Sequence, residues 1–125
     1  MVILDTCAII EICKNKPAFK KKTLKLMNMG SAILSISFAE IVCKVKLGKL
    51  EMSVSPRALY NEFEKIQHIE IIDINPELWL DSIDLDWPDN KDPADRIIVA
   101  FASQENIPIV TCDVKIKKFY KNVMW

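Results

Sequence analysis

Short runs of mostly apolar residues alternate with amphipathic segments along this chain, and the alternation narrows the choice of fold. The runs lie at residues 1–4, 32–36, 69–73, 107–111 and 122–125. Apolar residues at consecutive positions are typical of strands that are buried on both faces of a sheet. Such strands separated by helices predict a parallel sheet with helices on both sides, which is an α/β fold.

Helical spacing and helix-boundary residues fill the segments between these runs. We expect helices over residues 6–14, 37–47, 55–67 and 76–83, one between Pro17 and Gly30, one beginning at Asp92-Pro93 and a short one after Asp113. Residues 84–91 predict a loop. A length of 125 residues fits one domain that covers residues 1–125.

The formal net charge is zero, which argues against a polycation that coats nucleic acid or a membrane. The charges are nevertheless unevenly distributed. Residues 1–50 carry nine lysines and three acids, residues 51–113 carry four basic and fourteen acidic residues, and residues 114–125 add four lysines. This distribution allows the protein to hold a cation in one place and meet a polyanion beside it.

The cysteines and the apolar runs indicate where the protein resides. Its four cysteines form no C-x-x-C pair, and the sequence starts without a secretory segment. We expect reduced thiols, each a small buried hydrophobic residue, in a cytoplasmic protein. No apolar run approaches the length that spans a bilayer, so we expect a soluble protein without membrane contact.

Four carboxylates fall where the carboxyl ends of the predicted strands meet. Asp5 follows the first strand and Asp113 the fourth, while Glu40 and Asp95 lie near the starts of two helices. Ligands of open parallel sheets gather at this edge. Four carboxylates held together would repel one another unless a cation neutralised them, and their hard oxygen atoms suit Mg²⁺ or Mn²⁺.

Each carboxylate alone also has a purely structural interpretation. The pattern Ser37-x-x-Glu40 is typical of a capped helix start, and so is Asp92-x-x-Asp95. Asp5 and Asp113 could be turn residues at strand ends. The metal hypothesis is favoured because four unrelated caps or turns would not be expected to place all four carboxylates at the same end of one sheet.

The same segments resemble PIN domains, most closely the VapC-like toxins of toxin–antitoxin pairs, over essentially the whole chain. The matching segments are Val2-Ile3-Leu4-Asp5-Thr6, Ser37-Phe38-Ala39-Glu40-Ile41, Asp92-Pro93-Ala94-Asp95-Arg96-Ile97-Ile98-Val99-Ala100 and Ile109-Val110-Thr111-Cys112-Asp113. The resemblance implies an α/β/α sandwich of three layers with a central parallel sheet. It also implies that Asp5, Glu40, Asp95 and Asp113 form a catalytic, metal-binding quartet, with Thr6 and Thr111 supporting them.

The activity implied by this resemblance is metal-dependent hydrolysis of RNA, with tRNA or rRNA as possible substrates. Such sites use one or two metal ions to activate water and offset charge on phosphate. Residue 116 is Ile where some family members carry a further acid, which leaves one ion or two open. The resemblance further implies a small antitoxin partner and a homodimer.

Lysines could supply contacts to RNA phosphates. Lys115 and Lys117 lie just beyond Asp113, and further lysines cluster between residues 14 and 49. A solvated helix face is the alternative for these lysines. Arg96 could meet a phosphate or form a structural ion pair with a carboxylate, and the ion pair is slightly favoured.

Other chemistries fit the residues less well. A cysteine nucleophile would need His68, the single histidine, which is expected at the opposite end of the sheet. Zinc-ligand spacing is absent, and the acidic loop at 84–95 lacks the glycine of an EF-hand. A receiver-like phosphoacceptor domain would need a second acid at the first strand. A catalytically inactive PIN-like module that binds RNA or protein stays the main alternative.

Overall fold

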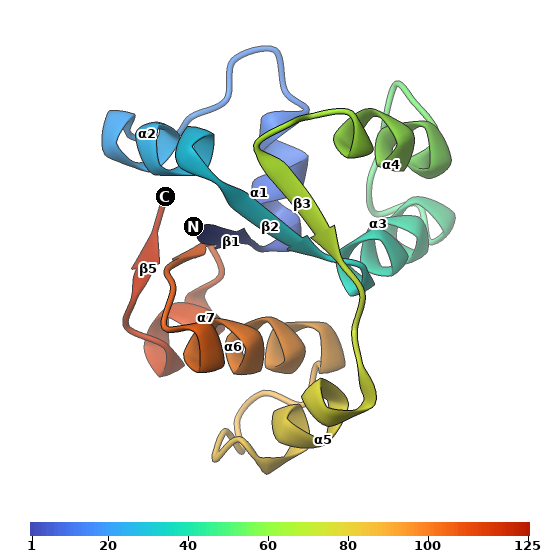
Figure 1. Cartoon of the computed structure of the whole chain (residues 1–125). Helices are drawn as coiled ribbons and strands as arrows, with labels where there is room; N and C mark the ends of the chain where they lie inside the picture. Colours follow the sequence, from blue (N-terminus) through green and yellow to red (C-terminus); the bar gives the residue numbers. More distant parts are fainter.

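Five parallel strands form a single sheet in the order β3-β2-β1-β4-β5 in the computed structural model, which describes residues 1–125 (Figure 1). The strands are β1 (Val2–Leu4), β2 (Ser31–Leu34), β3 (Ile69–Ile72), β4 (Ile109–Val110) and β5 (Val123–Met124). The three inner strands are buried throughout, whereas the edge strands β3 and β5 are not. The continuous apolar runs therefore correctly predicted a parallel sheet.

Seven helices cover both faces of the sheet (Figure 1). They are α1 (Thr6–Ile12), α2 (Lys21–Met29), α3 (Ile36–Lys46), α4 (Pro56–Glu64), α5 (Pro76–Asp84), α6 (Pro93–Glu105) and α7 (Val114–Phe119). Each expected helix is present, and residues 85–92 form the expected loop between α5 and α6. None of the seven combines the length and the apolar character that crossing a bilayer requires.

Two hydrophobic clusters fill the spaces between the three layers. Val2 and Leu4 of β1 pack with residues of α1 to α4 on one face, and Ile3 packs with α5, α6 and α7 on the other. Successive side chains of a strand point to opposite faces, so a run of three apolar residues serves both clusters. The three-layer α/β/α architecture is thereby confirmed.

Capping residues set several of the helix starts. Ser55 accepts a hydrogen bond from the backbone of Ala58, and Asn75 accepts one from Leu78. Gly30 and Gly48 adopt positive φ angles of 149° and 70° after α2 and α3. Glycine reaches these angles without the strain that a Cβ atom would add, so both helices end where the sequence predicted.

The expectation that the cysteines are buried is wrong for three of the four. Cys13, Cys43 and Cys112 are exposed, and only Cys7 is half-buried. Cys13 caps the end of α1 and Cys112 follows the end of β4, where few other elements cover the chain. All four are free thiols, as expected.

The inner position of β2, between β3 and β1, predicts which apolar residues control stability. Ile33 is fully buried, and Ile33→Ala should lower the free energy of unfolding by about 3 kcal/mol because it leaves a cavity between two layers. Ile83 of α5 is 69% exposed, so Ile83→Ala is the matched control and should cost less than about 0.5 kcal/mol. Urea denaturation followed by circular dichroism measures both, and equal losses would contradict this assignment of the core.

Candidate active site

The parallel sheet brings the candidate carboxylates to its carboxyl edge. Asp5 follows β1 and Asp113 follows β4, its neighbour in the sheet. Glu40 lies in α3, which begins just beyond β2, the other neighbour of β1. Asp95 lies in the first turn of α6. The ends of two adjacent strands and two helices therefore contribute one carboxylate each.

Asp5 is the most tightly held of the four. Its Oδ1 accepts a hydrogen bond of 2.7 Å from the backbone N–H of Thr6, and its Oδ2 accepts one of 2.7 Å from the Thr111 hydroxyl. The side chain is also almost fully buried, with 4% of the residue exposed. Burial raises the pKa of Asp5, as does the negative charge of Asp113, although the hydrogen bonds from Thr111 and Thr6 oppose the shift.

Glu40 is tied to Asp5 through Thr6 and does not cap its own helix. The Thr6 hydroxyl donates a hydrogen bond of 2.6 Å to Glu40 Oε2, and Lys44 Nζ lies 3.7 Å from Glu40 Oε1. The residue before α3 is Ser35, so Ser37 is inside the helix and its Oγ has no hydrogen-bond partner. The capping-box interpretation of Ser37-x-x-Glu40 is therefore wrong.

Asp113 serves both the fold and the candidate site. Its Oδ1 accepts a 3.0 Å hydrogen bond from the backbone of Ile116 and so caps α7. Its own backbone N–H donates to the Thr111 hydroxyl at 3.0 Å, and that hydroxyl donates to Asp5. Thr111 thus ties the Asp5 carboxylate to the backbone of Asp113.

Asp95 has the most altered acidity in the group. Burial is the main reason that its pKa rises to about 7, and the charges of Asp92, Asp5 and Asp113 add to the rise. A hydrogen bond of 2.8 Å from Asn90 Nδ2 opposes it. Asp92 is the helix cap that its position predicted, since it accepts a hydrogen bond from the Ala94 backbone.

The mutual repulsion of these carboxylates is the property that a cation would relieve. The charge of Asp113 raises the pKa values of both Asp5 and Asp95, the charge of Asp5 adds to the rise at Asp95, and all of their donor atoms are hard oxygens. The donor chemistry fits Mg²⁺ or Mn²⁺. As they stand, no three Asp, Glu, His or Cys side chains converge closely enough to ligate a single ion.

Asn90 and Cys7 are site residues that the sequence interpretation missed. Asn90 is 2% exposed, donates to Asp95 and accepts a hydrogen bond of 2.9 Å from the backbone of Asp92. Cys7 Sγ lies 3.4 Å from Asp5 Oδ2 and accepts a hydrogen bond from the Cys112 backbone. The position of Cys7 two residues after Asp5 was a usable signal, whereas nothing in the sequence of the loop singled out Asn90.

Arg96 holds the loop that carries Asn90, which corrects both expectations for this residue. Its five N–H donors meet backbone carbonyls at the end of α5 and in the following loop, at 2.7 to 3.1 Å. The acceptors are Ser82, Ile83, Leu85, Trp87 and Asn90. Arg96 has no carboxylate partner, and no donor remains for a phosphate.

Lys115 and Lys117 are exposed on α7, the helix that Asp113 caps. No acidic side chain pairs with either lysine. His68 precedes β3 and so lies at the amino end of the sheet, as expected. A histidine-assisted cysteine site at the carboxyl edge has therefore no base.

Comparison with known proteins identifies relatives of this architecture. A family model described as PIN domain matches residues 2–122. The chain is similar to a toxin–antitoxin complex from Klebsiella pneumoniae, with 18% identity, a TM-score of 0.70 and coverage of 100% of this chain and 97% of the other. It is also similar to VapBC2 from Rickettsia felis bound to a promoter DNA fragment, with 21% identity, a TM-score of 0.68 and coverage of 100% and 98%. At these identities the likenesses establish the fold alone. No curated protein matches the chain.

The raised pKa of Asp95 predicts a pH-dependent gain in stability for Asp95→Asn. Because the folded-state pKa is about 7 and the ordinary value is 3.8, the folded protein binds more protons between these values and loses stability as pH rises through them. In EDTA, Asp95→Asn should raise the unfolding temperature at pH 8 by about 4 °C. Below pH 4 the difference should vanish. Asp89→Asn, in the exposed loop, is the control, and an equal effect of Asp95→Asn at both pH values would contradict the assignment.

The carbonyl contacts of Arg96 predict a large effect of its removal on stability. Arg96→Met keeps the aliphatic stem but loses five hydrogen bonds, so the free energy of unfolding should fall by about 3 kcal/mol. Arg57→Met, on the exposed face of α4, is the matched control and should change it by less than about 0.5 kcal/mol. Urea denaturation measures both, and similar values for the two variants would show that Arg96 does not hold the loop.

Proposed function

The chain belongs to the PIN-domain family, and from this premise we propose that it is a metal-dependent endoribonuclease, the toxin of a VapBC-type toxin–antitoxin pair. The family match agrees with the resemblance drawn from the four sequence motifs and extends over residues 2–122. Family membership supports nuclease chemistry, and the arrangement of this chain's own residues supports the assignment of the site.

One observation carries the proposal: two threonines link the Glu40 and Asp5 carboxylates to each other and to the backbone of Asp113 at the carboxyl edge of the sheet. Glu40 accepts from the Thr6 hydroxyl, and the backbone N–H of the same Thr6 donates to Asp5. Asp5 accepts from Thr111, which in turn accepts from the backbone of Asp113. Helix capping alone requires neither threonine hydroxyl bond to Glu40 and Asp5, so these contacts support a role for the two acids beyond capping.

In this proposal Asp5, Glu40, Asp95 and Asp113 would hold Mg²⁺ or Mn²⁺. When bound there, one or two such ions would acidify a water molecule and offset charge on the scissile phosphate. In this chemistry the protein's carboxylates would hold and orient the metal ion, and none of them would attack the phosphate. The Thr6 and Thr111 hydroxyls keep Glu40 and Asp5 in place, and Asn90 does the same for Asp95.

The thiol beside the site has no nucleophilic role in this proposal. Burial and the charge of Asp5 raise the pKa of Cys7, so its thiol stays protonated at neutral pH. Lys115 and Lys117, which follow Asp113 on α7, would contact the phosphates of the RNA. Arg96 is left out of these contacts because its donors are occupied.

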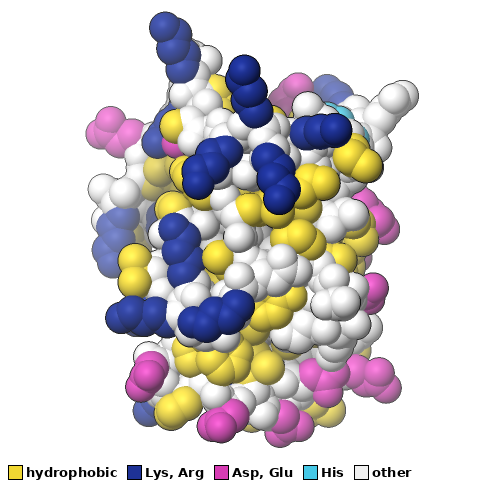
Figure 2. All heavy atoms as spheres, turned by 90° about the vertical axis from the view of Figure 1, so that its left-hand side faces the viewer, with side chains coloured by type: hydrophobic (Ala, Val, Ile, Leu, Met, Phe, Trp, Pro, Cys, Tyr) yellow, Lys and Arg dark blue, Asp and Glu magenta, His cyan; other side chains and the backbone are white.

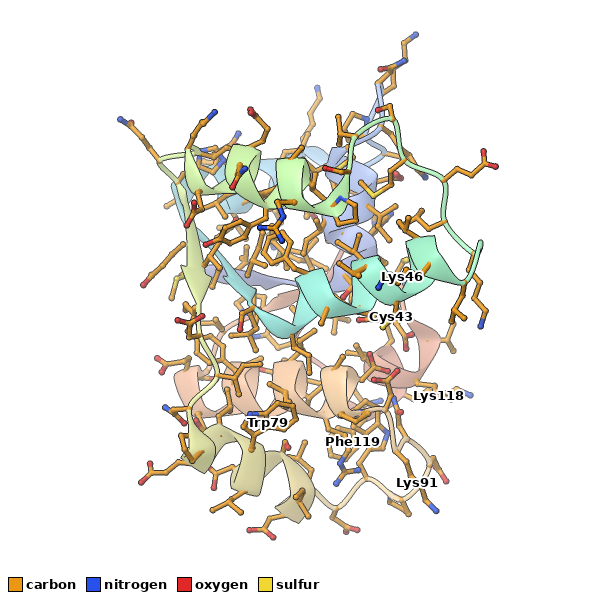
Figure 3. All side chains as sticks on the ribbon, turned by 90° about the vertical axis from the view of Figure 1, so that its right-hand side faces the viewer. Cys43, Lys46, Trp79, Lys91, Lys118 and Phe119 are labelled. Atoms are coloured by element: carbon orange, nitrogen blue, oxygen red, sulfur yellow. The ribbon has the colours of Figure 1, made fainter.

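Exposed apolar residues support protein partners, a small antitoxin and a second copy of the chain. On α5, Trp79 is 41% exposed, Leu80 63% and Ile83 69%. Trp79 extends from α5 toward α6 in Figure 3, and α5 with the following loop borders a cavity of about 570 Å³. Exposed apolar surface of this kind is typical of interaction sites. The free thiols fit a cytoplasmic protein.

Cleavage of a mixed tRNA and rRNA pool tests the proposed activity. The purified protein should cut RNA with Mg²⁺ or Mn²⁺ but not with EDTA, and Asp95→Asn should lower the rate at least about a hundredfold because one metal ligand loses its charge. Asp89→Asn, an exposed acid of the neighbouring loop, is the control and should cut like the wild type. Absence of cleavage under every metal, or equal cleavage by Asp95→Asn, would favour an inactive module that binds RNA or protein.

A further inference from the structure

Two segments without any acidic residue are brought side by side in the fold. Residues 12–39 contain six lysines and no Asp or Glu, and residues 114–125 contain four lysines and no Asp or Glu. The segments meet where the Thr23 hydroxyl donates a 2.9 Å hydrogen bond to the carbonyl of Trp125 and where Phe19 packs on the Trp125 ring at 4.9 Å. Helix α2 and the segment from α7 to β5 therefore form one continuous surface.

Lysines gather on this surface, which we call the α2–α7 basic face. Figure 2 shows Lys and Arg side chains over its upper part and along one side, with Asp and Glu at its margins and lower end. Its members are exposed and have no acidic partner within ion-pair distance. They are Lys16, Lys20, Lys21, Lys22, Lys25, Lys115, Lys117, Lys118 and Lys121. Lys118 extends away from α7 in Figure 3.

The lysines at the start of α2 are unfavourable for the stability of this helix. Lys20 occupies the N-cap position without a side-chain cap, and Lys21 and Lys22 occupy the first turn. The helix N-terminus carries a partial positive charge, which disfavours cations there, and Lys21 and Lys25 repel each other at a spacing of four residues. Residues that break a local folding rule without a structural gain are typical of functional surfaces.

The basic face reaches the candidate active site through α7. Asp113 caps this helix, so Lys115 and Lys117 lie within four residues of a carboxylate of the site. A polyanion bound in the site would continue along α7 toward β5 and α2. We propose that the α2–α7 basic face binds the phosphate backbone of a structured RNA whose scissile segment enters the acidic site, an inference that rests on the proposed ribonuclease function.

Binding of bulk tRNA in EDTA tests the basic face without metal and without cleavage. The α2 variant Lys20→Gln, Lys21→Gln, Lys25→Gln is compared with the control variant Lys49→Gln, Arg57→Gln, Lys65→Gln, which removes the same charge from exposed positions near α3 and α4. We expect the α2 variant to bind tRNA about tenfold more weakly at 0.1 M salt, with a salt slope lower by about 2. The control variant should change the affinity less than about twofold.

Two outcomes of the comparison would overturn the proposal. Equal losses in the α2 and control variants would mean that only the overall charge matters. Unchanged binding of tRNA together with weaker binding of a DNA duplex would assign the face to DNA. Because cleavage is not read in this assay, a failed ribonuclease test would leave the binding contrast standing, and the reverse also holds.

A single substitution separates a binding role from a structural one. Lys21→Glu places an anion in the first turn of α2, where it should raise the unfolding temperature. The same variant should bind tRNA at least about fivefold more weakly than the wild type. A parallel fall in unfolding temperature and affinity would show that Lys21 supports the helix, and the proposal would then fail for α2.

Discussion

Parallel pairing of β1 with β2 on one side and β4 on the other is the constraint on which the site depends. All three strands run in the same direction, so the residues that follow them emerge at the same edge of the sheet. Asp5 and Asp113 are 108 positions apart in the sequence, yet one Thr111 hydroxyl bonds with both residues. An antiparallel arrangement of these strands would send the two carboxylates to opposite edges.

The carboxylates are held in place by hydrogen bonds that also stabilise neighbouring parts of the fold. Asp5 and Asp113 cap α1 and α7, so each uses one oxygen for a helix start. Asp95 differs, since its partner Asn90 lies in a loop that is itself held by Arg96. The remaining cost is burial of the charged groups together with repulsion from neighbouring acids, and both raise the pKa values of Asp5 and Asp95. A bound cation would offset both costs.

Acidic and basic residues are separated along the sequence and in the folded protein. The acids collect in the middle of the sequence and the lysines at its two ends, and the fold places the lysine-rich ends beside each other through Thr23 and Trp125. Helix α7 links the two regions, because its cap is an acid of the site and its exposed residues are lysines. The net charge of zero therefore conceals a strongly polarised surface.

The sequence by itself determined the order of strands and helices, the parallel sheet and the four carboxylates at its edge, because apolar periodicity, caps and strand ends are local properties. The PIN-domain resemblance followed from the same segments and is confirmed. Only the tertiary structure decided the roles of Arg96, Asn90 and Cys7, the exposure of three cysteines and the union of α2 with the end of the chain. Those features depend on contacts between residues distant along the chain or on how a loop folds back, and neither leaves a periodic signal in the sequence.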